Sequence, residues 1–129
     1  KGILKNYLLD TYYSKKLDLK SNGRAGGTTN LFFQNGLVSF KDLIKIHPRL
    51  LYVTETIGHG YNLVTGDYSV GASGSLIENG EFTYPVSEIT IAGNFKEIFK
   101  NLTLADDLEY KYASNAPTTL IEGMTLAGK

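Results

Sequence analysis

The dipeptide Asn79-Gly80 most constrains the fold of this chain, because it separates two runs of strand-forming residues, 75–77 and 82–84. Asn-Gly is favoured in tight hairpin turns, where both central residues need positive φ. Residues 88–92 then alternate polar and apolar side chains, as a half-buried strand does. Together with a strand-like run at 52–57, these segments predict strands of one antiparallel sheet system.

Pro85 follows the second run of the hairpin and cannot donate a backbone hydrogen bond. We therefore expect this strand to end at Pro85, to lie at a sheet edge there, or to bulge.

The segment before the hairpin is rich in glycine, which permits positive φ and close backbone approach. The spacing favours bulges and turns between sheet strands. The alternative interpretation is a backbone-lined groove for an extended ligand. The glycines concerned are Gly58, Gly60, Gly66, Gly71 and Gly74.

Two helices are predicted from their capping signals. Ser39 is a typical N-cap, and His47-Pro48 should stop that helix because the residue before proline avoids the helical region. We expect His47 to be a charge partner for the helix C-terminus. Asn94 begins a capping box, and apolar residues at helical spacing predict a helix over 95–102. The predicted fold class is α+β, with mostly antiparallel β-sheet and a few short helices.

The amino-acid composition limits the classes of partner that this chain is expected to bind. The chain has 129 residues, of which 42% are hydrophobic, enough for one domain with a core. Its formal net charge is +0, so we expect no nucleic acid and no membrane surface as partner. No cysteine is present, which excludes disulfides and thiolate zinc ligands. No apolar run is long enough for a membrane span, and a cytoplasmic location is expected. Because the chain opens on lysine rather than methionine, we expect it to be part of something longer.

The two histidines, His47 and His59, are far apart, and neither is followed by Glu as in a helical zinc protease. His59 has Glu55 and Asp67 nearby in sequence, which are residue types that ligate metals. A hydrogen-bonded structural or surface histidine is the more common outcome, and we expect no zinc site in this chain.

Asp67 should accept hydrogen bonds from local backbone amides, or contact a peptide backbone instead. Asp106-Asp107 is expected to be solvated rather than a paired carboxylate site.

An ordered series of short segments runs along the chain, including Thr-Gly-Asp-Tyr-Ser at 65–69 and Glu-Asn-Gly-Glu at 78–81. The other segments lie at 51–54, 58–60 with Asn62, 71–74, 84–86, 88–94 and 124–128, with weaker ones at 12–14 and 29–31. In this series the chain resembles the C-terminal domain of the TldD/PmbA peptidase family, and specifically its PmbA (TldE) branch. The resemblance covers essentially the whole chain, and the series is more specific than any one motif in it.

The resemblance implies a two-subunit protease that cleaves peptides and unfolded segments inside an enclosed cavity. In this family the TldD-type subunit holds zinc through an HExxxH helix and a cysteine, which the PmbA-type partner lacks. The present chain has neither pattern. Residues 112–116 read Tyr-Ala-Ser-Asn-Ala where the TldD branch places its cysteine, and the HExxxH region would lie upstream. Zinc is therefore expected in the TldD-type partner and no cofactor in this chain.

We expect residues 1–129 to be a single domain, the C-terminal part of a longer PmbA/TldE-like protein. Its function is predicted to be that of a non-catalytic subunit, paired with a TldD-type subunit and a peptide or unfolded-protein substrate. A self-sufficient peptidase with its site upstream, and an interaction module of the DNA gyrase modulator type, stay open as alternatives, as does a homo-oligomer. No catalytic or metal-binding residue is predicted.

Contact with substrate or partner is expected from residues beside the glycines of 58–74. A sheet edge holds an extended peptide by main-chain hydrogen bonds, and glycines let it approach closely. Polar and amphipathic side chains of this segment would line such an edge. The predicted contact residues are His59, Tyr61, Asn62, Asp67 and Tyr68.

Overall fold

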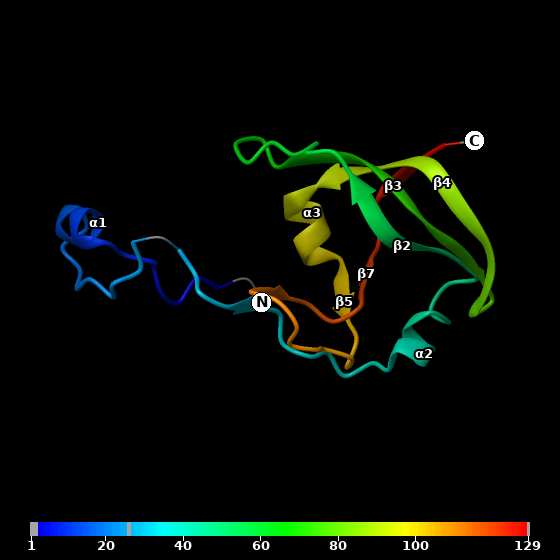
Figure 1. Cartoon of the computed structure of the whole chain (residues 1–129), viewed down its shortest axis with the longest axis horizontal. Helices are drawn as coiled ribbons and strands as arrows, with labels where there is room; N and C mark the ends of the chain where they lie inside the picture. The colour runs from blue at the N-terminus through cyan, green and yellow to red at the C-terminus, as the bar shows by residue number, and fades with distance from the viewer. Residues whose placement is uncertain (1–2, 26, 129) are drawn as a thin grey trace. The chain divides into compact units, whose positions relative to one another are not determined.

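The computed structural model describes residues 3–25 and 27–128 (Figure 1). The chain divides into two compact units. The first unit comprises the residues up to Phe33 together with Tyr110–Asn115. It contains the helix α1 (Thr11–Lys16) and two short parallel strands, β1 (Leu31–Phe32) and β6 (Ser114–Asn115).

The second unit comprises Gln34–Glu109 and the residues from Ala116 onwards, and it carries most of the sheet structure. Four strands form an antiparallel sheet in the order β2-β3-β4-β8, and β5 pairs antiparallel with β7. The strands are β2 (Arg49–Ile57), β3 (Asp67–Glu78), β4 (Glu81–Asn94), β5 (Leu102–Leu104), β7 (Thr119–Ile121) and β8 (Thr125–Ala127). The helices are α2 (Phe40–Leu43) and α3 (Phe95–Lys100). The α+β prediction is confirmed.

The β3–β4 hairpin turns at Asn79 and Gly80, as the sequence predicts. Both residues have positive φ, 53° and 83°, and Glu78 pairs with Glu81 across the turn. This is the conformation for which Asn-Gly is favoured. Two long strands of the sheet are thus joined by a turn of two residues.

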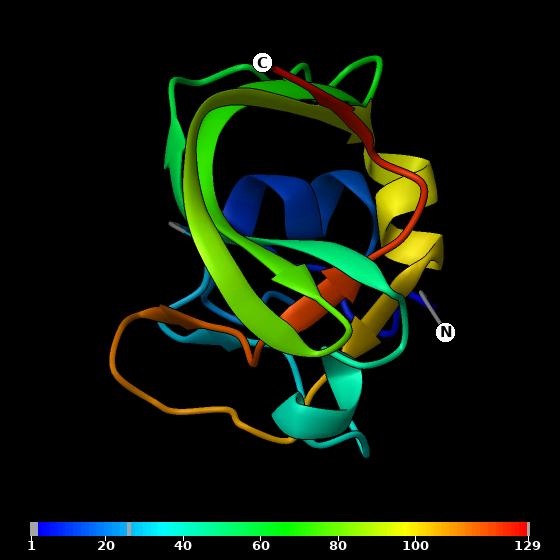
Figure 2. The ribbon, with the colours of Figure 1, turned by 90° about the vertical axis from the view of Figure 1, so that its right-hand side faces the viewer.

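Three β-bulges bend the sheet at neighbouring places. Thr54 is the extra residue where β2 pairs with β3. Two more bulges lie in β4, one near Pro85 and one at Glu88, whose φ is 55°. A bulge bends its strand and raises the local twist. Accordingly, Figure 2 shows β3 and β4 as strongly curved ribbons. Of the three outcomes expected at Pro85, the strand end is not observed, since β4 continues to Asn94. A bulge lies beside Pro85, and among the described residues this part of β4 pairs only with β3, so it is also at a sheet edge.

Gly74 lies opposite the bulge in β2, where the two strands approach closely. A Cβ atom at this position would overlap the carbonyl oxygen of Tyr52. This observation agrees with the interpretation of the glycines as bulge and turn positions.

The core of the second unit lies on one face of the curved sheet. Val70, Ala72 and Ile91 are buried, with relative exposures of 5%, 1% and 7%. Partly buried apolar side chains pack against them, namely those of Leu51, Val53, Tyr68, Ile89 and Met124. These residues come from β2, β3, β4 and the segment before β8, and Val70 and Ile91 are direct partners across β3 and β4.

The short helices follow their capping signals with some differences in length. The Ser39 side chain accepts from the backbone N–H of Asp42 at 3.1 Å, so Ser39 is the N-cap of α2. The Asn94 side chain caps α3 through the N–H of Lys96, also at 3.1 Å. α3 ends at Lys100, and residues 102–104 form strand β5 instead of the helical turn that we expected. Within the described residues, no helix is long and apolar enough to cross a membrane.

Candidate functional site

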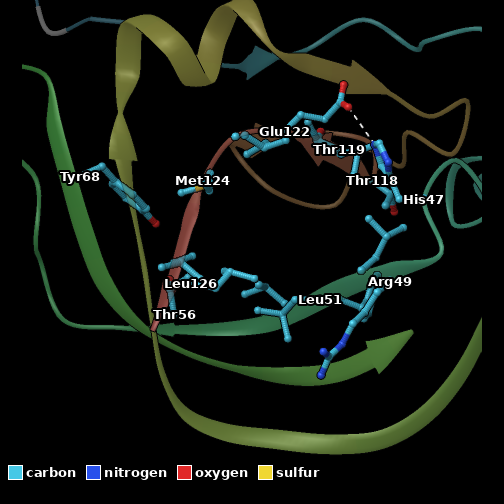
Figure 3. Close-up of a pocket in the computed structure, with 17 residues that line it drawn as sticks. His47, Arg49, Leu51, Thr56, Tyr68, Thr118, Thr119, Glu122, Met124 and Leu126 are labelled. Atoms are coloured by element: carbon cyan, nitrogen blue, oxygen red, sulfur yellow. Dashed lines mark hydrogen bonds and ion pairs between the residues drawn. The ribbon is translucent and has the colours of Figure 1, made fainter. Parts of the chain in front are cut away.

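A pocket of about 620 Å³ lies in the second unit, inside the curl of the sheet (Figure 3). One wall is formed by β2, through residues 49–53 and Thr56. The opposite wall is the segment 118–124, which includes β7. His47, which precedes β2, and Tyr68 of β3, Ile91 of β4 and Leu126 of β8 complete the lining. None of these lining residues except Tyr68 was predicted from the sequence as a contact residue.

The lining changes character along the pocket. Tyr68, Met124 and Leu126 lie at one end in Figure 3, and the charged residues lie toward the other. The lining residues with ionisable side chains at that end are His47, Arg49 and Glu122. Part of the apolar lining belongs to the core cluster, so the pocket borders on the core of the second unit.

His47 and Glu122 form an ion pair or hydrogen bond between the two walls, with 2.8 Å from Nε2 to Oε1. The prediction that His47 partners a helix C-terminus is therefore wrong. Helix α2 ends at Leu43, before His47, and the imidazole contacts the carboxylate of Glu122 instead. Both side chains are partly exposed, at 40% and 51%.

The loop between β2 and β3 contains most of the contact residues predicted from the sequence, and it is held together by short-range hydrogen bonds. The Asn62 side chain accepts from the backbone N–H groups of Val64 and Thr65, at 2.9 and 3.2 Å. The Asn62 backbone N–H in turn donates to the carbonyl of Asp67 at 2.8 Å. Asn62 thus closes the turn of this loop, a common use of asparagine.

Asp67 accepts from two side chains rather than from local backbone amides, so that prediction is wrong. The Thr65 hydroxyl donates to one carboxylate oxygen at 2.7 Å, and the Asn94 amide donates to the other at 3.1 Å. Both bonds favour the ionised carboxylate, so they lower the pKa of the Asp67 carboxyl below its ordinary value. The bond from Thr65 has the larger effect and the bond from Asn94 the smaller. The same Asn94 caps α3, so Asp67 ties the loop to the end of β4.

The remaining predicted contact residues differ in their surroundings. Tyr68 lines the pocket and packs on Phe95, with 5.5 Å between the ring centroids. Tyr61 is 52% exposed and pairs with Tyr68 in an isolated antiparallel bridge. His59 is exposed in the loop. The structure therefore brings only Tyr68 to the pocket and leaves His59, Tyr61 and Asn62 on the loop.

Two apolar residues of this loop were missed by the sequence analysis. Leu63 is 80% exposed and Val64 is 96% exposed, although the turn that carries them is tightly hydrogen-bonded. The signal that could have found them is their position between Asn62 and Thr65-Gly66, which are turn residues and so place the pair at a loop tip.

The donor atoms of this chain do not fit the zinc site that the family implies for its TldD-type members. The sequence has no cysteine, and its two histidines are separate. Over residues 3–25 and 27–128, no group of three or more His, Asp or Glu side chains is arranged to hold a metal ion. We therefore derive no catalytic step through a metal held by these residues.

The sequence model of the PmbA/TldA metallopeptidase C-terminal domain matches residues 1–128. The chain belongs to this family, which confirms the resemblance found in the sequence. It is 44% identical over 129 residues to Metalloprotease PmbA of Escherichia coli O157:H7, covering 99% of this chain and 29% of that relative. It is 43% identical to a PmbA homolog of Haemophilus influenzae, covering 98% and 29%. The chain thus spans about 29% of the length of these curated relatives.

Two solved structures have the same fold. A protein of Thermotoga maritima, described as a candidate modulator of a DNA gyrase, superposes with a TM-score of 0.86 at 33% identity, covering 98% of this chain and 31% of that chain. A protein of Bacteroides thetaiotaomicron, described in the same way, superposes with a TM-score of 0.84 at 32% identity, covering 100% and 29%.

Proposed function

We propose that this chain is the C-terminal domain of a non-catalytic subunit in a TldD/PmbA-type metalloprotease complex that cleaves peptides and unfolded segments. The observation that carries the proposal is the match to the family over residues 1–128 in a sequence without the cysteine that the TldD branch uses as a zinc ligand. In this proposal a TldD-type subunit supplies the zinc, the two subunits form a heterodimer, and the complex acts in the cytoplasm.

The loop between β2 and β3 is the proposed contact with the substrate or the TldD-type subunit. Its turn is preorganised by Asn62, so ordering it on binding would require little further entropy. Leu63 and Val64 present aliphatic side chains to the solvent at its tip, and Tyr61 adds an exposed amphipathic ring. Tyrosine is among the residues that carry most of the binding energy in protein interfaces, and exposed aliphatic side chains around it would exclude water from such a contact.

The pocket in the second unit supports a role in holding substrate. Its volume of about 620 Å³ falls within the range of roughly 300–1,000 Å³ that is common for binding sites. Its apolar floor combined with a few polar groups is also typical of such sites.

The first experiment mixes the full-length protein with and without a TldD-type subunit and measures peptide cleavage and zinc content. We expect cleavage only in the mixture, with zinc bound to the TldD-type subunit. Cleavage by the full-length protein alone would favour the self-sufficient peptidase. Equal cleavage by the TldD-type subunit alone would contradict a required second subunit.

Tyr61→Ala tests the loop contact within that complex. Loss of one contact should weaken cleavage by the equivalent of about 1–2 kcal/mol, while the TldD-type subunit keeps its zinc. Asp67→Ala should also weaken cleavage, but it releases the loop from Asn94 as well. Thermal unfolding of each variant separates the two effects, because a purely structural role would lower the melting temperature without a separate defect in cleavage.

A further inference from the structure

The beginning of the first unit, residues 3–24, has a defined conformation but almost no core of its own. The Leu9 backbone N–H donates to the Asn22 side chain at 2.9 Å, and the Asn22 amide donates to the carbonyl of Tyr7 at 2.7 Å. The Arg24 backbone N–H donates to the carbonyl of Leu9 at 3.2 Å. Leu9 is nevertheless the only apolar side chain of residues 3–24 that is buried.

The other large apolar side chains at this end of the chain face solvent, and we refer to residues 3–19 as the apolar segment. Eight aliphatic or aromatic side chains of the apolar segment are 48–74% exposed, the most exposed being Ile3, Leu4 and Tyr12. Fixing the conformation of a chain costs entropy, which the burial of apolar surface has to offset. One buried leucine does not offset the ordering of the whole segment, so we infer that another surface covers it.

The charges of the first unit describe the chemistry of that covering surface. Residues 1–33 and 110–115 contain seven lysine or arginine residues but only two aspartates. Four exposed lysines lie within the apolar segment or next to it, namely Lys5, Lys15, Lys16 and Lys20. An apolar surface with carboxylates at its rim is complementary to this combination of exposed apolar side chains and lysines.

The lengths of the relatives indicate where such a surface comes from. This chain matches a C-terminal domain and spans about 29% of the two curated relatives, so most of each relative precedes the part that matches. In a protein of that length, only a few residues separate the apolar segment from the preceding part of the polypeptide. The preceding part therefore meets the segment at a high effective concentration, whereas a second protein has to be captured from solution.

We propose that the preceding part of the same polypeptide covers residues 3–19 in the full-length protein, through an apolar surface with carboxylates at its rim. The first unit is then held in place by that preceding part, whereas the second unit has its own core. This inference goes beyond the proposed function, because it holds whether or not the full-length protein is a catalytic subunit.

The test cross-links the full-length protein in the absence of a TldD-type subunit. A water-soluble carbodiimide joins a lysine amine to a carboxylate as an amide, and the reagent takes up the water that is lost and becomes a urea. Isotope-labelled and unlabelled protein are mixed in equal amounts before the reaction, and cross-linked peptides are identified by mass spectrometry. We expect Lys5, Lys15, Lys16 or Lys20 to join Asp or Glu residues that precede Lys1, in peptide pairs that carry a single isotope.

Every other pattern of cross-links would overturn the inference. Pairs that combine both isotopes would show that a second copy of the protein covers the apolar segment. Cross-links to Asp or Glu residues after Phe33 would show that the second unit covers it. Cross-links that form only after a TldD-type subunit is added, and that end on this subunit, would make the segment a subunit interface. The absence of any cross-link from these lysines would mean that no carboxylate-rimmed surface lies over the segment.

Two variants of the full-length protein test the apolar contact itself. Leu8→Lys places a charge on a residue of the apolar segment that is 53% exposed, and Thr28→Lys places the same charge at an exposed position outside it. Hydrogen exchange of the Leu9 and Arg24 amides should accelerate by about tenfold or more in Leu8→Lys, because the cover is displaced, and stay unchanged in Thr28→Lys. Equal exchange in the two variants would contradict an apolar contact at residues 3–19.

Discussion

The loop between β2 and β3 and the pocket beside β2 differ in how they are built. Most hydrogen bonds that shape the loop join residues of 59–69, and the distant partners among the described residues are the neighbours Asn94 and Phe95. The pocket is assembled from β2, β3, β4, β8 and the segment around β7. The loop could be predicted from the sequence because glycine, asparagine and aspartate are common where the backbone adopts turn conformations. The pocket has no comparable local signal.

The largest expected effect concerns the backbone beneath the pocket. Gly74→Ala should lower the free energy of unfolding by about 3 kcal/mol, because the added methyl group would overlap the Tyr52 carbonyl oxygen at the bulge. Gly71→Ala is the matched control on the same strand, since its Cβ would lie 3.5 Å from Ile57, an ordinary contact. Denaturant unfolding measures both, and equal destabilisation would contradict the special role of Gly74.

The next effect concerns the loop. Asn62→Ala removes the acceptor of two backbone N–H groups, and we expect it to lower the free energy of unfolding by about 1 kcal/mol. Val64→Ser in the same turn should leave stability nearly unchanged, because Val64 is 96% exposed. Hydrogen exchange of the Val64 and Thr65 amides should accelerate in Asn62→Ala. Unchanged exchange would show that the loop does not depend on this side chain.

A smaller effect is expected from the pair that joins the pocket walls. His47 and Glu122 are 40% and 51% exposed, so solvent screens their interaction. A double-mutant cycle with His47→Ala and Glu122→Ala should give a coupling of about 0.5 kcal/mol in the free energy of unfolding. A coupling several times larger would mean that the His47–Glu122 pair holds the two walls together, so that the shape of the pocket depends on this pair.

The smallest effect is the pH dependence contributed by Asp67, whose carboxylate is exposed. Its pKa is lowered in the folded state from 3.8, so its contribution to stability is present above pH 3.8 and is lost as the pH falls through the lower folded pKa. An NMR titration of the Asp67 carboxyl should show this directly. Thr65→Val should return the pKa toward its ordinary value more than Asn94→Ala does. The reverse order would contradict the assignment of the Thr65 hydroxyl as the main cause.

Much of the fold was predictable because its signals are local. The Asn79-Gly80 turn and the Ser39 and Asn94 caps all depend on residues within a few positions of one another. The same locality explains the errors. The helix expected over 95–102 had a continuous apolar stripe, but Leu102 lies in β5 because residues 102–104 pair with 119–121. A distant strand outweighed a local helical preference.

The sequence by itself determined the family, the antiparallel hairpin and the absence of cysteine ligands, because each of these depends on residue identity and short spacing. Only the tertiary structure decided that His47 meets Glu122 across 75 positions and that residues of β2 and of the segment 118–124 face one pocket. The physical reason is the curl of the sheet. The bulges at Thr54, next to Pro85 and at Glu88 bend the strands by an amount that no local pattern specifies, and that bend brings β2 and the segment 118–124 to the same cavity.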